Sequence, residues 1–204
     1  MILPFLLLLP FQIHIDLPLA PTDSRTEFEN EWVRIVRVNY SAYQKTAVHD
    51  HPAAPTVYVY TTDGGRLKIV HPEYPDPTIR PPVKAGGIRY QKAEAEHHSV
   101  EELDGVASEY IRVELKIEPI DPPPVDVRRP AGDRTPYESQ MLRILRVTCS
   151  PHAPCPGSQH AEDPAVVITG RDFKWLDAFA APLVNPSDQP QEQVRIELKA
   201  KPVH

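Results

Sequence analysis

Proline constrains the fold of this chain more than any other residue type. The 204 residues include 25 prolines but only 8 glycines. Because proline lacks a backbone N–H and its ring clashes with the preceding turn, it interrupts helices and is excluded from the centre of sheets. Apolar and polar residues alternate in many short runs, whereas no long stretch repeats its apolar residues with a helical period. We therefore expect an all-β protein of short strands joined by many turns.

Composition limits the kinds of partner. The formal net charge is -6, with 25% charged and 41% hydrophobic residues. A negative chain of ordinary globular composition lacks the basic surface with which proteins bind nucleic acids or anionic membranes. We therefore expect neither a nucleic acid nor a membrane surface as a partner. Monomer and homodimer both remain open as oligomeric states.

The first 21 residues, MILPFLLLLPFQIHIDLPLAP, are mostly apolar but too short to span a bilayer as a helix. Their length suits a signal peptide over residues 1–20, with a small residue, Ala20, near its end. However, no lysine or arginine precedes the apolar run, and the alternating segment 11–17 is also typical of a strand. Two interpretations follow: an exported protein, periplasmic or secreted, or a cytoplasmic protein with an N-terminal strand.

Two cysteines, Cys149 and Cys155, lie six positions apart in CSPHAPC. In an exported protein this spacing suits a local disulfide that braces a proline-rich loop. The nearby His152 and His160 give a zinc site as the alternative, although the spacing matches no established zinc-finger pattern.

The chain also contains a repeat of itself. At an offset of 109 residues, FENEWVRIVRVNYS (28–41) aligns with YESQMLRILRVTCS (137–150), and HPAAPTVYVY (51–60) aligns with HAEDPAVVIT (160–169). Further on, RVELKIEP (112–119) aligns with RIELKAKP (195–202) at an offset of 83. Since 109 − 83 = 26, the second copy lacks 26 residues, which corresponds to about three strands with their turns.

We therefore expect a complete barrel over residues 21–119 and a truncated copy over 137–204, joined by a proline-rich linker, 120–136. The truncated copy cannot enclose a cavity alone, so we expect it to pack against the complete barrel as a cap. Residues that occur in both copies are expected to be structural, as in cross-strand charge pairs. They are Arg34, Arg37, Glu114 and Lys116, which recur as Arg143, Arg146, Glu197 and Lys199.

Residues found only in the complete copy are the functional candidates, and three histidines stand out. His49 and His51 differ by two positions, so on a strand both imidazoles lie on one face. His98 follows a Gly-Gly turn and is the third candidate ligand. The second copy has Ser158 and Ala181 in place of His49 and His98. A metal centre is therefore expected in the first copy only; the alternative is histidines hydrogen-bonded at the barrel mouth without a metal.

At these motifs the first copy, from about residue 28 to 118, resembles a cupin. HDHPAAPTVYVYTTDG carries the family's H-x-H and closing glycine as His49, His51 and Gly64. PPVKAGGIRYQKAEAEHHSVEE places His98 at the family's second-motif histidine, with Glu102 where an asparagine is usual. The second copy resembles a degenerate cupin. The resemblance implies a jelly-roll barrel of six to eight strands, with a divalent metal held by histidines at its mouth.

One departure from the family pattern affects the ligand set. The family's glutamate would fall at Pro55 or Thr56, neither of which carries a carboxylate. The three-histidine set that remains also occurs in some cupins, notably thiol and diketone dioxygenases. Imidazole ligands suit Fe, Cu, Ni or Zn, with Mn also open. We expect Asp50 and His97 to face away from this centre.

Two functions follow from the resemblance. The leading one is a small metalloenzyme of the oxygenase or lyase type. The alternative is a non-catalytic module that binds a small ligand or a metal. No residue is assigned a catalytic role beyond metal binding, and no other catalytic motif is present.

Tyrosines are concentrated in the first copy and are candidates for the wall of a ligand pocket. Tyr58 and Tyr60 share one strand face, so either they or the neighbouring valines point inward. Tyr90 is a third candidate, and Tyr40 and Tyr43 are also specific to the first copy.

Four carboxylates complete the set of titratable candidates. We expect them to lie on a solvated surface loop, with a base near the metal as the alternative for one of them. They are Glu94, Glu96, Glu101 and Glu102.

Overall fold

A computed structural model of the chain describes residues 24–117, 137–156 and 162–202. Within these ranges every regular element is a β-strand, as the proline content predicts. The candidate signal peptide (1–20), the linker (120–136) and His160 lie outside the described residues. No helix in the described ranges is long and apolar enough to cross a membrane.

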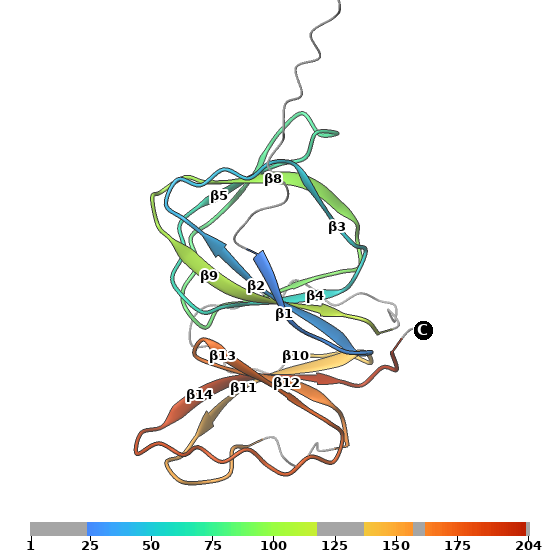
Figure 1. Ribbon diagram of the computed structural model, residues 1–204, viewed down its shortest axis with the longest axis vertical. Coiled ribbons are helices and arrows are strands. Elements are labelled where there is room, and N and C mark those ends of the chain that lie inside the picture. The colour runs from blue at the N-terminus through green and yellow to red at the C-terminus, as the bar shows by residue number, and fades with distance from the viewer. Residues whose placement is uncertain (1–23, 118–136, 157–161, 203–204) are drawn as a thin grey trace, which may run out of the picture.

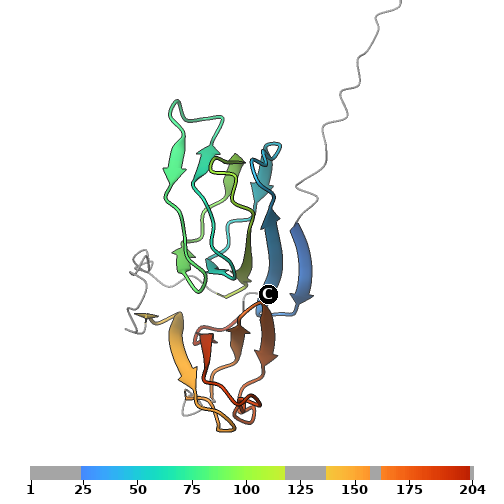
Figure 2. The ribbon, with the colours of Figure 1, turned by 90° about the vertical axis from the view of Figure 1, so that its left-hand side faces the viewer.

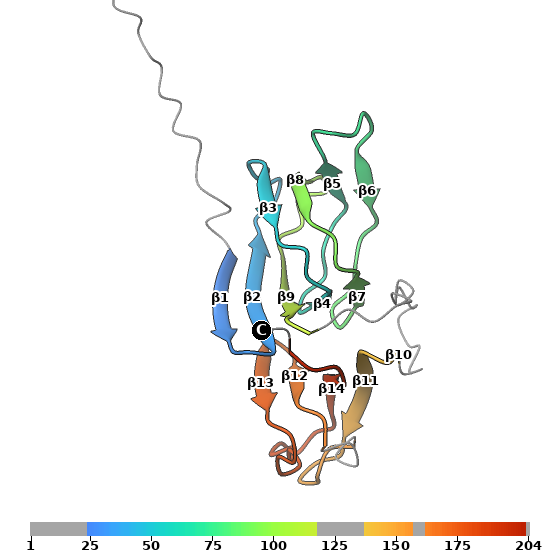
Figure 3. The same ribbon diagram turned by 90° about the vertical axis from the view of Figure 1, so that its right-hand side faces the viewer.

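The strands form three antiparallel sheets, which Figures 1 and 3 show stacked along the long axis of the molecule. The five-stranded middle sheet has the order β1 (Ser24–Glu29), β2 (Val33–Tyr40), β9 (Ser108–Leu115), β4 (Thr56–Tyr60), β7 (Ile88–Gln91). The four-stranded upper sheet has the order β3 (His49–His51), β8 (Glu96–Glu102), β5 (Leu67–Val70), β6 (Thr78–Arg80). The five-stranded lower sheet has the order β10 (Tyr137–Glu138), β11 (Leu142–Cys149), β14 (Gln191–Leu198), β12 (Ala165–Thr169), β13 (Asp172–Leu176).

The middle sheet has a core on each of its faces. One hydrophobic cluster lies between it and the upper sheet and includes Tyr58, Tyr60 and Val100. A second cluster joins it to the lower sheet and includes Val57 and Ile196. All five residues of β4 are therefore buried, because neither face of this strand reaches solvent. Figure 2 shows the same division: the upper and middle sheets form a barrel, and the lower sheet covers the outer face of the middle sheet.

The middle and lower sheets are built to the same plan. Val33 pairs with Leu115 in the middle sheet, and the residues aligned with them, Leu142 and Leu198, pair in the lower sheet. The strand orders correspond as well. Among the described residues the second half has no counterpart of the upper sheet. It therefore cannot form a barrel of its own and instead covers the first half.

The charged residues that both halves share form cross-strand ion pairs. Arg34 lies 2.5 Å from Glu114, and the aligned Arg143 lies 2.7 Å from Glu197. The aligned lysines pair in the same way: Lys116 with Glu29 at 2.5 Å, and Lys199 with Glu138 at 2.9 Å. The expectation of a structural role is confirmed for these pairs.

Cys149 and Cys155 form a disulfide, so the zinc alternative for this loop is wrong. Both sulfurs are bonded to each other, and His152 instead contacts Asp188 at 2.7 Å.

Candidate functional site

The three candidate histidines lie on two neighbouring strands of the upper sheet. His49 in β3 pairs directly with His98 in β8, and His51 lies two positions further along β3 on the same face. The ring centroids are 4.8 Å apart for His49–His51, 5.0 Å for His49–His98 and 4.9 Å for His51–His98. One nitrogen from each ring lies within 4.8 Å of the others, an arrangement suited to binding one metal ion.

Burial keeps two of these rings neutral. His98 is 5% exposed, and burial lowers its pKa to about 4. Burial is also the largest cause that lowers the pKa of His51 to about 2, followed by the charge of Arg112. Both imidazoles are therefore uncharged near pH 7, which is the state in which histidine binds metals.

The hydrogen bonds of His49 and His98 fit a cation. Nδ1 of His49 lies 3.0 Å from the carbonyl oxygen of Ala47 and donates to it, which leaves the lone pair of Nε2 available. Nδ1 of His98 is buried and has no hydrogen-bond partner among the described residues. The carboxylate of Glu96 lies 3.6 Å from this nitrogen, so a metal shared with His49 and His51 would bind the other ring nitrogen of His98, Nε2.

His51 makes a contact that competes with metal binding. Its Nδ1 lies 2.6 Å from Nη1 of Arg112. Because arginine can only donate, Nδ1 accepts this bond, and the neutral ring then carries its proton on Nε2. His51 can therefore bind a metal only when this contact with Arg112 is given up.

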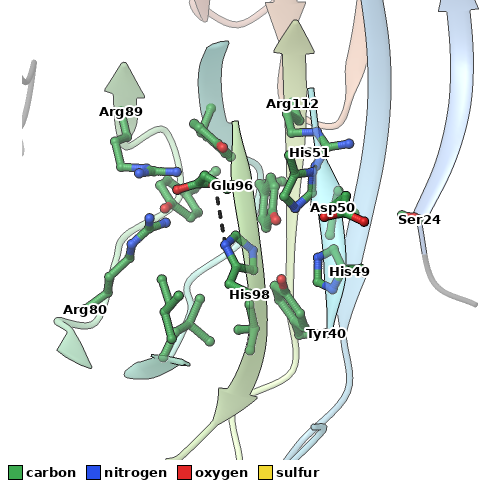
Figure 4. Close-up of a pocket in the computed structure, with 17 residues that line it drawn as sticks. Ser24, Tyr40, His49, Asp50, His51, Arg80, Arg89, Glu96, His98 and Arg112 are labelled. Atoms are coloured by element: carbon green, nitrogen blue, oxygen red, sulfur yellow. Dashed lines mark hydrogen bonds and ion pairs between the residues drawn. The ribbon is translucent and has the colours of Figure 1, made fainter. Parts of the chain in front are cut away.

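The histidines open onto a cavity of about 220 Å³ between the middle and upper sheets. Figure 4 shows His49 and His51 on one side of it, with His98 and Glu96 at the centre and Arg80 and Arg89 on the opposite side. Four buried tyrosines form part of the wall: Tyr40, Tyr58, Tyr60 and Tyr110.

No protein-family model matches the sequence, and no curated protein matches it significantly. Solved structures do match. A cupin domain from Bordetella pertussis is 21% identical, with a TM-score of 0.40 over 48% of this chain and 93% of that chain. GK1651 from Geobacillus kaustophilus is 9% identical, with a TM-score of 0.52 over 88% and 91% of the two chains. Oxalate decarboxylase from Bacillus subtilis, described with Mn(II) centres, is 13% identical, with a TM-score of 0.52 over 88% and 73%.

The chain has a cupin fold. At these identities the likeness extends to the fold alone. The chemistry of the site depends on this chain's own residues. The expected jelly-roll barrel is confirmed.

Glu96 lies inside the cavity, and Glu96, Glu101 and Glu102 all belong to strand β8, so the expectation of a solvated acidic loop is wrong for these three residues. Glu96 and Glu102 are the first and last residues of β8, and Glu102 is 1% exposed. The carboxylate of Glu96 lies 3.6 Å from Nδ1 of His98, and it forms a second potential ligand group with His71 and His98. Its position two residues before His98 on one strand was the sequence signal that it shares the same face.

The tyrosines divide between the two faces of the middle sheet. Tyr58 and Tyr60 line the cavity, while Val57 and Val59 point toward the lower sheet. Tyr90 is absent from the cavity wall, because its ring stacks on Tyr137 in the core between the middle and lower sheets.

The remaining candidates lie outside the centre. Tyr43 is 72% exposed and does not line the cavity. Asp50 and His97 contact each other at 2.7 Å, and His97 points away from the cavity, as the alternation along β8 predicts. Asp50 lies at the cavity rim with its side chain 83% exposed.

Proposed function

We propose that this cupin binds one divalent transition metal through His49, His51 and His98 and uses it in an oxygenase- or lyase-type reaction on a small molecule. The observation that carries the proposal is the set of three imidazoles with nitrogens within 4.8 Å of one another. The ligand type suits Fe, Cu, Ni, Zn or Mn. A bound metal would supply Lewis-acid or redox chemistry at the cavity.

The residues around this centre would position the small molecule and move protons. The Tyr58 hydroxyl donates to Oε1 of Gln91 at 3.0 Å, and burial raises its pKa to about 12. Burial also raises the pKa values of Tyr40 and Tyr110. These phenols therefore stay protonated near neutral pH and can only donate or accept as hydroxyls. Glu96 is the carboxylate within the cavity that can accept a proton beside His98.

A second function, binding of a small ligand or metal without turnover, is favoured by the contact between His51 and Arg112. The family's glutamate ligand is also missing, since Pro55 and Thr56 occupy its place. A cupin barrel can hold a ligand without catalysing its conversion, because the fold alone does not decide the function.

We infer further that residues 137–202 are a truncated copy of the first half. The matching strand pairings of the middle and lower sheets support this inference. Tyr43 and His152, which align with each other, also share a positive φ, of 57° and 51°. The role of the copy would be to cover the outer face of the middle sheet.

The test of the metal proposal is elemental analysis of the tag-free protein and of single alanine variants. We expect close to one metal ion per chain in the wild type and a large loss in His51→Ala and His98→Ala. His97→Ala is the matched control, because His97 is adjacent to His98 but half-exposed and paired with Asp50. A wild-type protein that takes up none of Fe, Cu, Ni, Zn or Mn would refute the metal centre. Metal without turnover of any substrate would favour the binding function.

A further inference from the structure

Two arginines reach the cavity from outside the histidine strands. Arg80 ends β6 in the upper sheet, and Arg89 lies in β7 of the middle sheet. Both line the cavity, and Figure 4 shows their guanidinium groups pointing toward its centre, across from His49 and His51. Because the two strands belong to different sheets, the fold brings these like charges together.

Neither arginine has a carboxylate within ion-pair distance in the described part of the chain. By contrast Arg112, the third arginine of the cavity, pairs with Glu114 at 2.9 Å. Burial and then the charge of Arg89 lower the pKa of Arg80. The cavity thus contains two guanidinium groups that repel each other and form no direct ion pair with a described carboxylate.

The hydrogen bonds of Arg89 are also incomplete. Its Nη2 donates to Oε1 of Gln91 at 3.0 Å, and its guanidinium carbon lies 3.8 Å above the ring of Tyr58. These contacts fix the orientation of the side chain. Its Nε is buried without a hydrogen-bond partner among the described residues. An oriented but unsatisfied donor beside a second cation is a site prepared for an anion.

We propose that Arg80 and Arg89 form a subsite for the carboxylate group of a small substrate. The assignment of that molecule as a substrate rests on the proposed function of the histidine centre, on the other side of the same cavity. A guanidinium group matches a carboxylate with parallel N–H···O bonds, and such charge-assisted bonds are strong in a partly buried site.

Charge and size select a carboxylate over a larger or more highly charged anion. Glu96 lies in the same cavity, so in the metal-free protein its carboxylate and the two arginines sum to a net charge of about +1, to which a divalent ion on the histidines would add. One carboxylate neutralises the metal-free charge, whereas a phosphate dianion would be repelled by Glu96. The cavity of about 220 Å³ is smaller than the roughly 300–1,000 Å³ of sites for drug-sized ligands, so the substrate has few heavy atoms.

The test is calorimetric titration of the full chain, metal-free and metal-loaded, with acetate, acetamide and inorganic phosphate. We expect acetate to bind, and acetamide, which has no negative charge, to bind far more weakly. Arg80→Gln and Arg89→Gln should each weaken carboxylate binding by about 10- to 100-fold, the loss expected for a charge-assisted hydrogen bond. Arg89→Lys keeps the positive charge but loses the paired N–H donors of the guanidinium group. Its carboxylate affinity should therefore lie between those of Arg89→Gln and the wild type.

The matched control is Arg66→Gln, because Arg66 is 53% exposed and pairs with Asp104 away from the cavity wall. It should bind carboxylates as the wild type does. The subsite would be refuted if Arg80→Gln and Arg89→Gln bound carboxylates as tightly as the wild type does. It would also be refuted if phosphate bound more tightly than any carboxylate. Metal analysis of the same samples separates the two proposals. Arginine-dependent carboxylate binding without any metal supports the subsite and refutes only the metal centre, whereas metal without such binding does the reverse.

Discussion

His98 combines deep burial with a ring nitrogen that has no hydrogen-bond partner among the described residues. It is 5% exposed, and its Nδ1 lies 3.6 Å from the carboxylate of Glu96. A carboxylate beside an imidazole orients the ring and makes it a better ligand. Glu96 therefore occupies a position from which it can strengthen metal binding, although it comes from a different strand from the one on which the family's glutamate was expected.

Changing Glu96 to glutamine should weaken metal binding about 10-fold, near the lower end of the range for carboxylates that support a ligating histidine. The change keeps the shape of the side chain and removes its charge. Competition with a chelating dye measures the affinity. Glu94→Gln is the control, because Glu94 is exposed and pairs with Lys92. Equal metal affinity in the wild type and Glu96→Gln would show that Glu96 does not contribute to the centre.

At the residue scale, the sequence predicted that the histidines would lie together. It did not predict that Arg80 and Arg89 would line the same cavity. The spacing of His49 and His51 is local, and a strand converts it directly into a shared face. Arg80 and Arg89 meet only because β6 and β7 lie in different sheets that close around one cavity. No spacing along the chain encodes that meeting. Glu96 was missed because the acidic residues around it resemble a solvated loop.

At the scale of elements, two aligned loops are stabilised in different ways. In the first half, the buried Glu102 carboxylate accepts backbone N–H bonds from Tyr43 at 2.9 Å and Gly105 at 2.7 Å. In the second half, the Cys149–Cys155 disulfide closes the corresponding loop. Asn185, aligned with Glu102, is fully buried and donates to the carbonyl oxygen of Cys149 at 3.2 Å. The disulfide therefore supports the half that does not contain the histidine-lined cavity.

Removing the disulfide should destabilise the second half and leave the metal centre intact. For a loop of this length the loss of unfolded-state constraint is worth about 2 kcal/mol. Chemical denaturation of Cys149→Ala/Cys155→Ala measures the free energy of unfolding, and elemental analysis measures the metal. Reduction of the wild type with dithiothreitol should give the same shift. Loss of metal in the double variant would contradict the separation of the two halves' roles.

The alternation that predicted strands could not tell which face of β4 points inward. Tyrosines and valines alternate there, and all five residues are buried because sheets cover both sides. Periodicity identifies a buried face only where the other face meets solvent. The sequence therefore left the choice between Tyr58 with Tyr60 and Val57 with Val59 open, and it could not place Tyr90 against Tyr137.

On the scale of the whole molecule, the second half covers the outer face of the middle sheet of the first half. One core cluster contains Val57 and Ile111 from the middle sheet together with Ile144 and Ile196 from the lower sheet. The lengths of the two matching parts of the sequence predicted that the shorter part would pack as a cap. The face it covers could not be predicted, because it depends on how apolar side chains from both sheets fit together.

An ion cluster around the buried Glu109 also joins the two halves. Glu109 in β9 accepts hydrogen bonds from Arg37 in β2 at 2.8 Å and from Nε of Arg171 at 3.0 Å. Arg171 lies in the turn between β12 and β13 of the second half. The hydrogen bond from Arg171 is the largest cause that lowers the pKa of Glu109, from 4.5 to about 2. Protonation of this one carboxylate therefore weakens the contact between the halves.

The stability of the folded chain should consequently depend on Glu109 in a defined pH range. Because the folded-state pKa is lower than the unfolded-state value, the stabilisation is complete above pH 4.5 and is lost as the pH falls toward 2. The shift corresponds to about 3 kcal/mol at 1.36 kcal/mol per unit. The Arg171 side chain is 65% exposed, so solvent screening reduces the expected contribution to about 1–2 kcal/mol.

Urea denaturation of the wild type and Glu109→Gln at pH 7, 5, 4 and 3 tests this dependence. At pH 7 the free energy of unfolding of the variant should be about 1–2 kcal/mol lower than that of the wild type, because glutamine cannot form the ion pairs with Arg37 and Arg171. The difference should shrink as the pH falls below 4.5, since the wild-type carboxylate itself becomes neutral. Glu73→Gln, at an exposed position between β5 and β6, should show little difference at any pH. A gap between wild type and Glu109→Gln that stays constant from pH 7 to pH 3 would mean that Glu109 joins the halves by its shape rather than by its charge.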